Sequence, residues 1–212
     1  MTEITNSSVY NLENAVRGAR NPLNSWAKID SCYDKENNYI LGENDLNLLS
    51  KLCRAGSDHR KFMRQILVSV DIKAPMYWWK EFDTYKVGTA ANSTSTMHKI
   101  HSTPFSPDDF SHDNLDGNSK GFLMEIIKHL EAERVLFNET KAKQHWWNII
   151  QILPSSYNQL RTCTMSYENL INIYFSRRNH KLNEWRVFCD WIEQLPYAKE
   201  LICGGKKEVF PQ

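Results

Sequence analysis

One segment of the chain alternates apolar and polar side chains as a β-strand does. In "RQILVSVDIK", Ile66, Val68, Val70 and Ile72 alternate with other residues, and Ser69 lies between two of them. Successive side chains of a strand point to opposite faces of a sheet, so a period of two indicates one buried face. The sequence therefore predicts a half-buried strand here, the clearest strand signal in the chain.

Helical spacing dominates most of the other periodic segments. In "ENDLNLLSKLCRAG", Leu46, Leu49 and Leu52 recur every three residues and the pattern ends at Gly56. That spacing and the final glycine favour a helix with a C-terminal glycine cap. Pro75 suits the first turn of the next helix, because proline lacks the N–H that would have no partner there.

The second half of the chain is expected to be mainly helical. The expected helices are 121–137, 143–153 before Pro154, and two within 167–196 that are separated near 179–181. The first is expected to turn Phe122, Ile126, Leu130 and Ala132 to one face. Residues 159–166 have the composition of a strand.

A stretch rich in turn-forming residues separates the two halves. Ser106 followed by Pro107 is typical of a short helical turn within an otherwise irregular connection at about 98–120. With few strands and many helices, the fold class is expected to be α+β and helix-rich. We expect one domain over residues 1–212, since 212 residues suffice for a single core.

Composition excludes several kinds of partner. Lys and Arg total 26 against 25 Asp and Glu, so no net charge favours bulk nucleic-acid or membrane-surface binding. The sequence has no run approaching 18 apolar residues, and its start lacks the pattern of a secretory signal. The five cysteines are widely spaced with no C-x-x-C pair, which favours reduced thiols. We expect a cytoplasmic protein.

A run of small polar side chains follows the most aromatic segment. Its members with hydroxyl or amide groups include Asn92, Ser93, Thr94, Ser95 and Thr96. They are either a pocket that hydrogen-bonds a small polar ligand or a capped surface turn.

No motif in the sequence assigns a catalytic residue. The chain has no G-x-S-x-G, P-loop or G-x-G-x-x-G pattern. His98, His101 and His112 have no carboxylate at ligand spacing on the same helix face, so no metal site is expected.

Four segments in succession resemble the flavin-dependent thymidylate synthase family. They are "NAVRGAR" (14–20), "HRKFMRQILVSVDIKAP" (59–75), "ILP" (152–154) and "ENLINIYFSRRNHKLNEW" (168–185). Each is short, and their order carries the resemblance. It implies a flavin-dependent thymidylate synthase-like fold with a small antiparallel sheet, assembling as a homotetramer with sites between subunits.

The chain departs from this family at its Arg-His-Arg signature, which is followed seven residues later by serine. Here Thr84-Tyr85-Lys86 stands at the tripeptide, and Thr94 stands at the serine. Asn92 and Thr96 stand where the family has Glu and Arg, and Asn169 stands at a flavin-contacting Arg. The resemblance matches Arg178 with a phosphate-binding Arg.

The resemblance assigns provisional roles to these side chains. Asn92–Thr96 and Arg178 would bind the nucleotide substrate, and Tyr85, Lys86 and Asn169 would contact FAD. Lys86, Arg178 and Arg177 would neutralise one phosphate group. These three cations are too few to neutralise the phosphates of both a nucleotide and FAD. FAD is therefore expected to bind weakly or not at all.

Two functions remain open from the sequence. One is a pyrimidine-nucleotide enzyme that carries out reductive methylation of dUMP or a related modification, with NADPH and methylene-tetrahydrofolate needed only if the family chemistry is kept. The other is a non-catalytic or redirected nucleotide-binding oligomer that does not use flavin.

Overall fold

The computed structural model describes residues 2–204. The strands are β1 (Glu3–Tyr10), β2 (Cys32–Tyr33), β3 (Tyr39–Ile40), β4 (Leu67–Pro75), β5 (Ala90–Ser93) and β6 (Asn158–Ser166). The α-helices are α1 (Leu12–Arg20), α2 (Glu43–Arg54), α3 (Met76–Phe82), α4 (Gly117–Thr140), α5 (Lys143–Ile152), α6 (Tyr167–Arg177) and α7 (Asn183–Glu193). The short turns are η1 (Asn21–Leu23), η2 (Trp26–Lys28), η3 (Lys61–Arg64), η4 (Asp83–Tyr85), η5 (Pro107–Asp109) and η6 (Lys199–Cys203), the last a π-helix.

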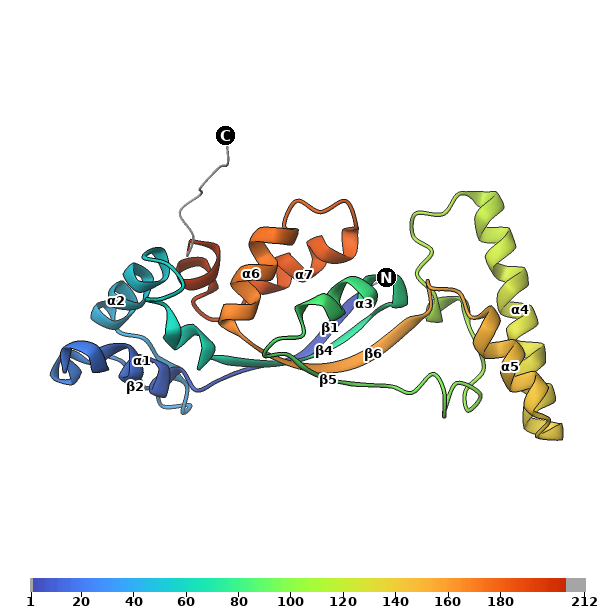
Figure 1. Cartoon of the computed structure of the whole chain (residues 1–212), viewed down its shortest axis with the longest axis horizontal. Coiled ribbons are helices and arrows are strands. Elements are labelled where there is room, and N and C mark those ends of the chain that lie inside the picture. Colours follow the sequence, from blue (N-terminus) through green and yellow to red (C-terminus); the bar gives the residue numbers. More distant parts are fainter. Residues whose placement is uncertain (1, 205–212) are drawn as a thin grey trace. The chain divides into compact units, whose positions relative to one another are not determined.

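Four strands form the main sheet, in the order β1-β4-β6-β5, and β2 pairs with β3 in a separate antiparallel hairpin (Figure 1). Thr164 Oγ1 donates to Ser69 Oγ over 3.3 Å, and Thr162 Oγ1 donates to Asp71 over 2.6 Å. From Ser69 to Asp71 the chain of β4 advances by two residues, while the partner on β6 moves back from Thr164 to Thr162. The two strands are therefore antiparallel. The predicted strands at 66–72 and 159–166 and the α+β class are confirmed.

Close contacts group the chain into two units. Among residues 2–204, unit 1 comprises 2–5, 71–84 and 91–162, and unit 2 comprises 6–70, 85–90 and 163–204. The chain passes between the units within β1, β4, η4, β5 and β6. The expectation of one domain remains a prediction.

Unit 2 holds a helical core around α1, α2, α6 and α7. The predicted helix over α2 is confirmed: Leu49 and Cys53 are buried, and Gly56 follows with a φ of +113°. A buried ion pair joins α1 to α2, since the Arg20 guanidinium lies 2.6 Å from the Asp45 carboxylate. Both side chains are almost fully buried, so removing one would leave an uncompensated charge in the core.

Unit 1 contains α3 and the antiparallel pair α4–α5. Trp79 on α3 donates its indole N–H to the Gln159 carbonyl on β6 over 2.9 Å, and the Arg161 guanidinium lies 4.2 Å from the Trp79 ring. The predicted helices at 121–137 and 143–153 are confirmed. The first begins earlier than predicted, at Gly117, where the Asp116 carboxylate accepts from Ser119 N–H, and it ends later, at Thr140.

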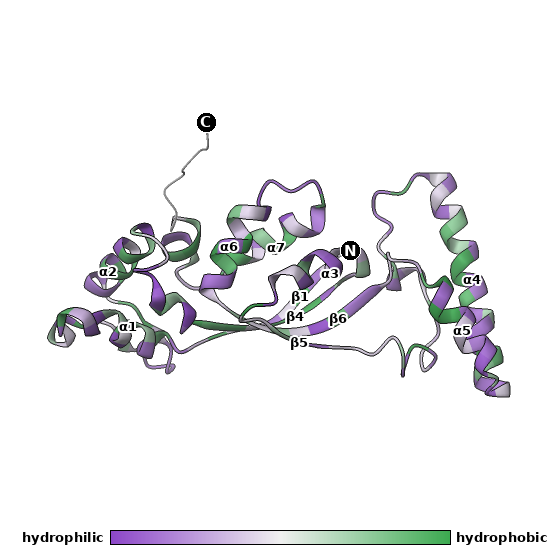
Figure 2. Cartoon of the chain, in the orientation of Figure 1, coloured by the Kyte–Doolittle hydropathy of each residue, from purple (hydrophilic) through white to green (hydrophobic). Residues whose placement is uncertain are grey.

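The buried face of α4 differs from the predicted one. Leu123, Ile127 and Leu130 are buried in a cluster with Ile149 of α5, whereas Phe122 is 70% exposed. Figure 2 shows hydrophobic residues along much of α4. Because this helix is apolar on more than one side, packing against α5 selects the buried face, and the sequence period alone does not.

The edge strands were not predicted from the sequence. β1 and β5 lie at the two ends of the sheet order, and β5 includes Asn92 and Ser93, for which a ligand pocket or a capped turn was expected. Most residues of both strands are exposed. An edge strand keeps the hydrogen bonds to its one neighbouring strand even when its side chains are polar. Its sequence therefore lacks the apolar alternation that marks β4.

All five cysteines are free thiols in the structure. Burial raises the pKa of the Cys53 thiol to about 12, although Arg60 partly opposes the shift. Cys53 is therefore a protonated core residue at neutral pH, which gives it no nucleophilic role.

Candidate functional site

Tyr85 lies at the centre of a group of aromatic and basic side chains in unit 2. Arg177 at the end of α6 donates from Nε to the Tyr85 hydroxyl over 2.8 Å. Its guanidinium also lies 4.8 Å from the Trp185 ring centroid, and the Tyr85 and Trp185 rings meet edge to face at 5.9 Å. His180 packs against Trp185 from the loop between α6 and α7, at 6.3 Å. We call these four residues the Tyr85 cluster.

The backbone leaves this cluster through a tight turn. Lys86 is exposed, and its carbonyl accepts from Thr89 N–H at 3.4 Å. Gly88 closes the turn with a φ of +73°, a conformation that other residues adopt only under strain. A side chain at this position would also meet Asn169, since its Cβ would lie 3.3 Å from the Asn169 amide oxygen.

Asn169 holds this turn to the start of α6. Its amide oxygen accepts from both the backbone and the hydroxyl of Ser166, which forms a capping box. Its amide nitrogen donates to the Val87 carbonyl over 2.7 Å. Asn169 thereby positions the turn that follows Tyr85, in addition to any contact with a ligand.

Thr89, the last residue of the turn, has a buried hydroxyl. Its Oγ1 has no hydrogen-bond partner among residues 2–204. A buried hydroxyl without a partner is costly, and such atoms in native proteins usually meet a water or a ligand. The turn thus combines an exposed ammonium group with an unused hydroxyl.

Arg178 lies one residue beyond Arg177 and points to different neighbours. It caps α6, and its guanidinium lies 5.0 Å from the Phe175 ring and 5.9 Å from the Tyr174 ring. The side chain is half-buried. The hydrogen bond to the Tyr85 hydroxyl comes from Arg177.

The polar segment from Asn92 to Thr96 belongs to unit 1. Asn92 and Ser93 end β5 and are exposed. Thr94 is joined to Leu160 of β6 by its backbone N–H at 2.9 Å and by its hydroxyl at 3.3 Å. Ser95 Oγ accepts from His98 N–H at 3.0 Å, as in a capped turn.

The structure brings together only part of the predicted site. Tyr85, Lys86 and Asn169 meet at one turn of unit 2, whereas residues 92–96 belong to unit 1. The predicted roles of all nine residues remain predictions. Sequence analysis assigned no role to His180 or Trp185, although Trp185 ends one of the segments that carry the resemblance.

In the part of the chain that the structure describes, histidine and acidic side chains do not gather into a metal centre. Within residues 2–204, no group of three or more His, Cys, Asp or Glu residues is arranged to hold a metal ion.

Comparison with known proteins identifies the fold. No family profile matches the chain, and no curated protein matches it in sequence. Among solved structures, a crystal structure of thymidylate synthase X (ThyX) from Helicobacter pylori with FAD and dUMP matches at a TM-score of 0.71 and 17% identity. The match covers 95% of this chain and 97% of the other. The chain has the fold of a flavin-dependent thymidylate synthase.

A second H. pylori ThyX complex with FAD and dUMP agrees. It matches at a TM-score of 0.70 and 17% identity, over 97% of this chain and 100% of the other. The resemblance inferred from four short segments is therefore confirmed for the fold, and the low identity agrees with a diverged chain. Within residues 2–204, no helix is both long enough and apolar enough to span a bilayer.

Proposed function

We propose that the protein binds a pyrimidine nucleotide such as dUMP and is an enzyme related to flavin-dependent thymidylate synthase. The fold supports this proposal, since both ThyX structures hold dUMP. The observation that carries it in this chain is the turn from Lys86 to Thr89, which offers an exposed cation and a buried, unpartnered hydroxyl beside the Tyr85 cluster.

Each side chain at the turn has a distinct part in this proposal. The Lys86 ammonium group would attract the nucleotide phosphate, and the Thr89 hydroxyl would form a hydrogen bond with it. Arg178 and residues Asn92–Thr96 would add further contacts, as the resemblance implies. Asn169 would position the turn by holding the Val87 carbonyl. The reaction would be reductive methylation of dUMP or a related modification, assisted by NADPH and methylene-tetrahydrofolate if that chemistry is kept.

The Tyr85 cluster fits a tightly bound FAD poorly. Arg177 Nε already donates to Tyr85, and its guanidinium stacks on Trp185. Asn169 uses both ends of its amide within the protein. A pyrophosphate group needs several charge-assisted donors, and Lys86 is the one exposed cation at this turn. We therefore derive no catalytic step through flavin.

The same observations favour a second candidate function. A nucleotide-binding oligomer that does not use flavin would need one phosphate site and no site for a dinucleotide. The engagement of Arg177 by Tyr85 and Trp185 favours this alternative. Spectroscopic measurement of flavin in the purified protein separates the two: flavin that co-purifies near stoichiometry supports the enzyme, and a colourless protein that binds dUMP supports the alternative.

Two substitutions test the binding proposal. Lys86→Ala and Thr89→Val should each weaken dUMP binding about tenfold, because a hydrogen bond to a charged group contributes ~1.5 to 3 kcal/mol. Lys51→Ala on the exposed side of α2 is the control, and it should leave the affinity unchanged. If all three variants bind dUMP like the unmodified protein, the turn does not bind the nucleotide.

A further inference from the structure

Unit 2 contains a large cavity. Its volume is about 1040 Å³, and its walls come from the end of β1, the start of α1, the β2–β3 hairpin and the segment that follows α7. None of the nine residues predicted to bind nucleotide or cofactor lines it. The predicted binding of nucleotide or cofactor therefore does not account for this cavity.

Five aromatic side chains line this cavity. Tyr33 and Tyr39 from the hairpin meet edge to face, with ring centroids 5.0 Å apart. Tyr10, Trp191 and Tyr197 complete the aromatic lining. The faces of aromatic rings carry partial negative charge and attract organic cations, most strongly where several rings surround one site.

The charge of the lining also favours a cation as ligand. Among the described residues that line the cavity, Glu13 is the only charged one, and none is a lysine or arginine. Its carboxylate accepts from the Tyr33 hydroxyl at 2.9 Å, and this bond raises the pKa of Tyr33. Because a phosphate would meet a carboxylate and no basic partner, this cavity disfavours the anionic ligands proposed for the Lys86 turn.

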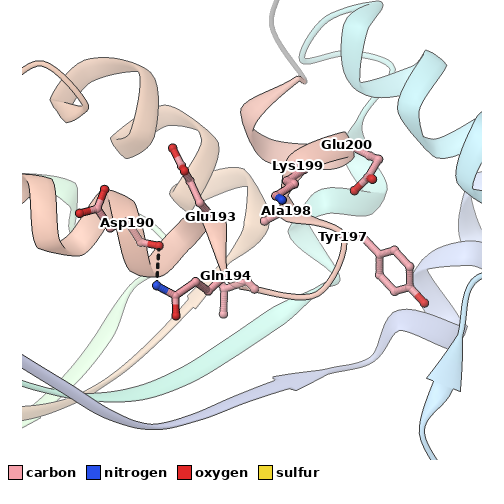
Figure 3. A pocket seen from close by; sticks show the side chains of 8 residues that line it. Asp190, Glu193, Gln194, Tyr197, Ala198, Lys199 and Glu200 are labelled. Atoms are coloured by element: carbon pink, nitrogen blue, oxygen red, sulfur yellow. Dashed lines mark hydrogen bonds between the residues drawn. The ribbon is translucent and has the colours of Figure 1, made fainter.

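A second pocket adjoins this cavity and is also acidic. The two pockets share Gln194, Leu195 and Tyr197. Figure 3 shows the carboxylates of Asp190, Glu193 and Glu200 around this second pocket, with Lys199 as its one basic side chain. A ligand that extends from one pocket into the other would pass from the aromatic lining to a surface rich in carboxylates.

The backbone around the cavity is unusual at several points. Asn11, Asn37 and Tyr197 all line it and have φ values of 72°, 64° and 56°. The π-helix η6 begins two residues after Tyr197. Positive φ at an aromatic residue and π-helical turns are both costly and are enriched at functional sites.

From this lining we propose that the cavity binds an elongated organic cation, a linear aliphatic amine with two or more ammonium groups. One ammonium group would lie against the Tyr33 and Tyr39 rings beside Glu13, and the second would face the carboxylates of the adjoining pocket. The methylene chain would contact apolar side chains of the lining such as Leu195.

A matched pair of probes tests the need for positive charge. 1,8-Diaminooctane and 1,8-octanediol have the same chain, and only the diamine is charged at pH 7. Calorimetric titration at fixed ionic strength should show saturable binding of the diamine and at least tenfold weaker binding of the diol. Equal binding of both probes, or no binding of the diamine at millimolar concentration, would overturn the proposal.

Variants then locate the binding. Glu13→Gln keeps an acceptor for the Tyr33 hydroxyl and removes the charge, and it should weaken diamine binding about tenfold. Glu139→Gln on the exposed surface of α4 is the control for general charge loss and should have no effect. Tyr33→Leu should weaken binding, while Tyr33→Phe keeps the ring and should retain it. Equal losses in both glutamate variants would assign the binding to general surface charge and contradict the proposal.

Discussion

The Tyr85 hydroxyl accepts a hydrogen bond from Arg177 Nε over 2.8 Å, although the two residues lie 92 positions apart in the chain. Tyr85 stands at the centre of the position where the resemblance expects Arg-His-Arg. A phenol at this point holds an arginine of α6 against Trp185. Tyr85, which stands where the family has histidine, therefore changes which groups the Arg177 side chain is able to contact.

Removing the Tyr85 hydroxyl should have a measurable cost. Tyr85→Phe deletes the acceptor for Arg177 and is expected to lower the free energy of unfolding by about 1 kcal/mol, the typical net contribution of a hydrogen bond. Urea denaturation measures the change. Tyr10→Phe, at an exposed tyrosine of β1, is the control and should be neutral. A neutral Tyr85→Phe variant would show that the bond contributes nothing to stability.

Restoring the signature should restore flavin binding. The combined change Thr84→Arg, Tyr85→His and Lys86→Arg adds one cation at position 84 and provides a planar donor at position 86. It is expected to raise FAD affinity at least tenfold, as followed by quenching of flavin fluorescence. An unmodified protein that already binds FAD tightly would mean that other residues replace the lost ionic contacts.

The polar segment has two interpretations that one pair of variants separates. If residues 92–96 bind the nucleotide, Thr94→Val should weaken dUMP binding about tenfold, and Arg178→Ala should weaken it at least as much. If the segment is a capped turn, Thr94→Val should only alter stability slightly, through its 3.3 Å bond to Leu160. Thr5→Val on β1 controls for loss of a hydroxyl.

Exposed apolar residues on α4 predict self-association. Phe122 is 70% exposed beside a groove that Leu115 and Ile126 also line. Light scattering is expected to give a mass well above the 24.9 kDa of one chain, and a homotetramer is the predicted state. Phe122→Ser should weaken the assembly, whereas Leu23→Ser, at a residue 82% exposed on η1, should not. A monomer at micromolar concentration would contradict the prediction.

The α4–α5 pair should lose stability in acid. Hydrogen bonds from His145 at 2.7 Å and from Asn148 at 3.0 Å lower the pKa of Glu133 from its usual 4.5. A lowered folded-state pKa means that the ionised carboxylate contributes stability above pH 4.5, and that this contribution is lost as the pH falls through the folded value.

Glu133→Gln measures that contribution. The variant should be destabilised by about 1 kcal/mol at pH 7, and the difference from the unmodified protein should shrink below pH 4.5. Urea denaturation across this range provides the profile. A difference that is constant with pH would show that the charge of Glu133 is not involved.

The sequence predicts the parts of the fold that depend on local periodicity. Val68 and Val70 are buried on β4 because a period of two leaves one face of a strand for the core. The buried face of α4 could not be predicted, since Phe122 and Leu123 are both apolar and only contact with α5 distinguishes them.

The candidate site was predicted in part, for the same physical reason. Tyr85 and Lys86 stand out because the resemblance aligns them with a signature. Arg177, which donates to Tyr85, and Asn169, which donates to the Val87 carbonyl, both come from α6. No local pattern pairs residues so far apart in sequence. The unpartnered Thr89 hydroxyl is visible only once the chain has folded around it.

Calorimetric titration of dUMP into the unmodified protein tests the central claim most directly, with deoxyuridine and inorganic phosphate as the two partial ligands. Saturable dUMP binding with a dissociation constant below about 0.1 mM, and at least tenfold weaker binding of both partial ligands, is the predicted result. No heat of binding from dUMP at millimolar concentration would contradict the claim that this chain is a nucleotide-binding protein.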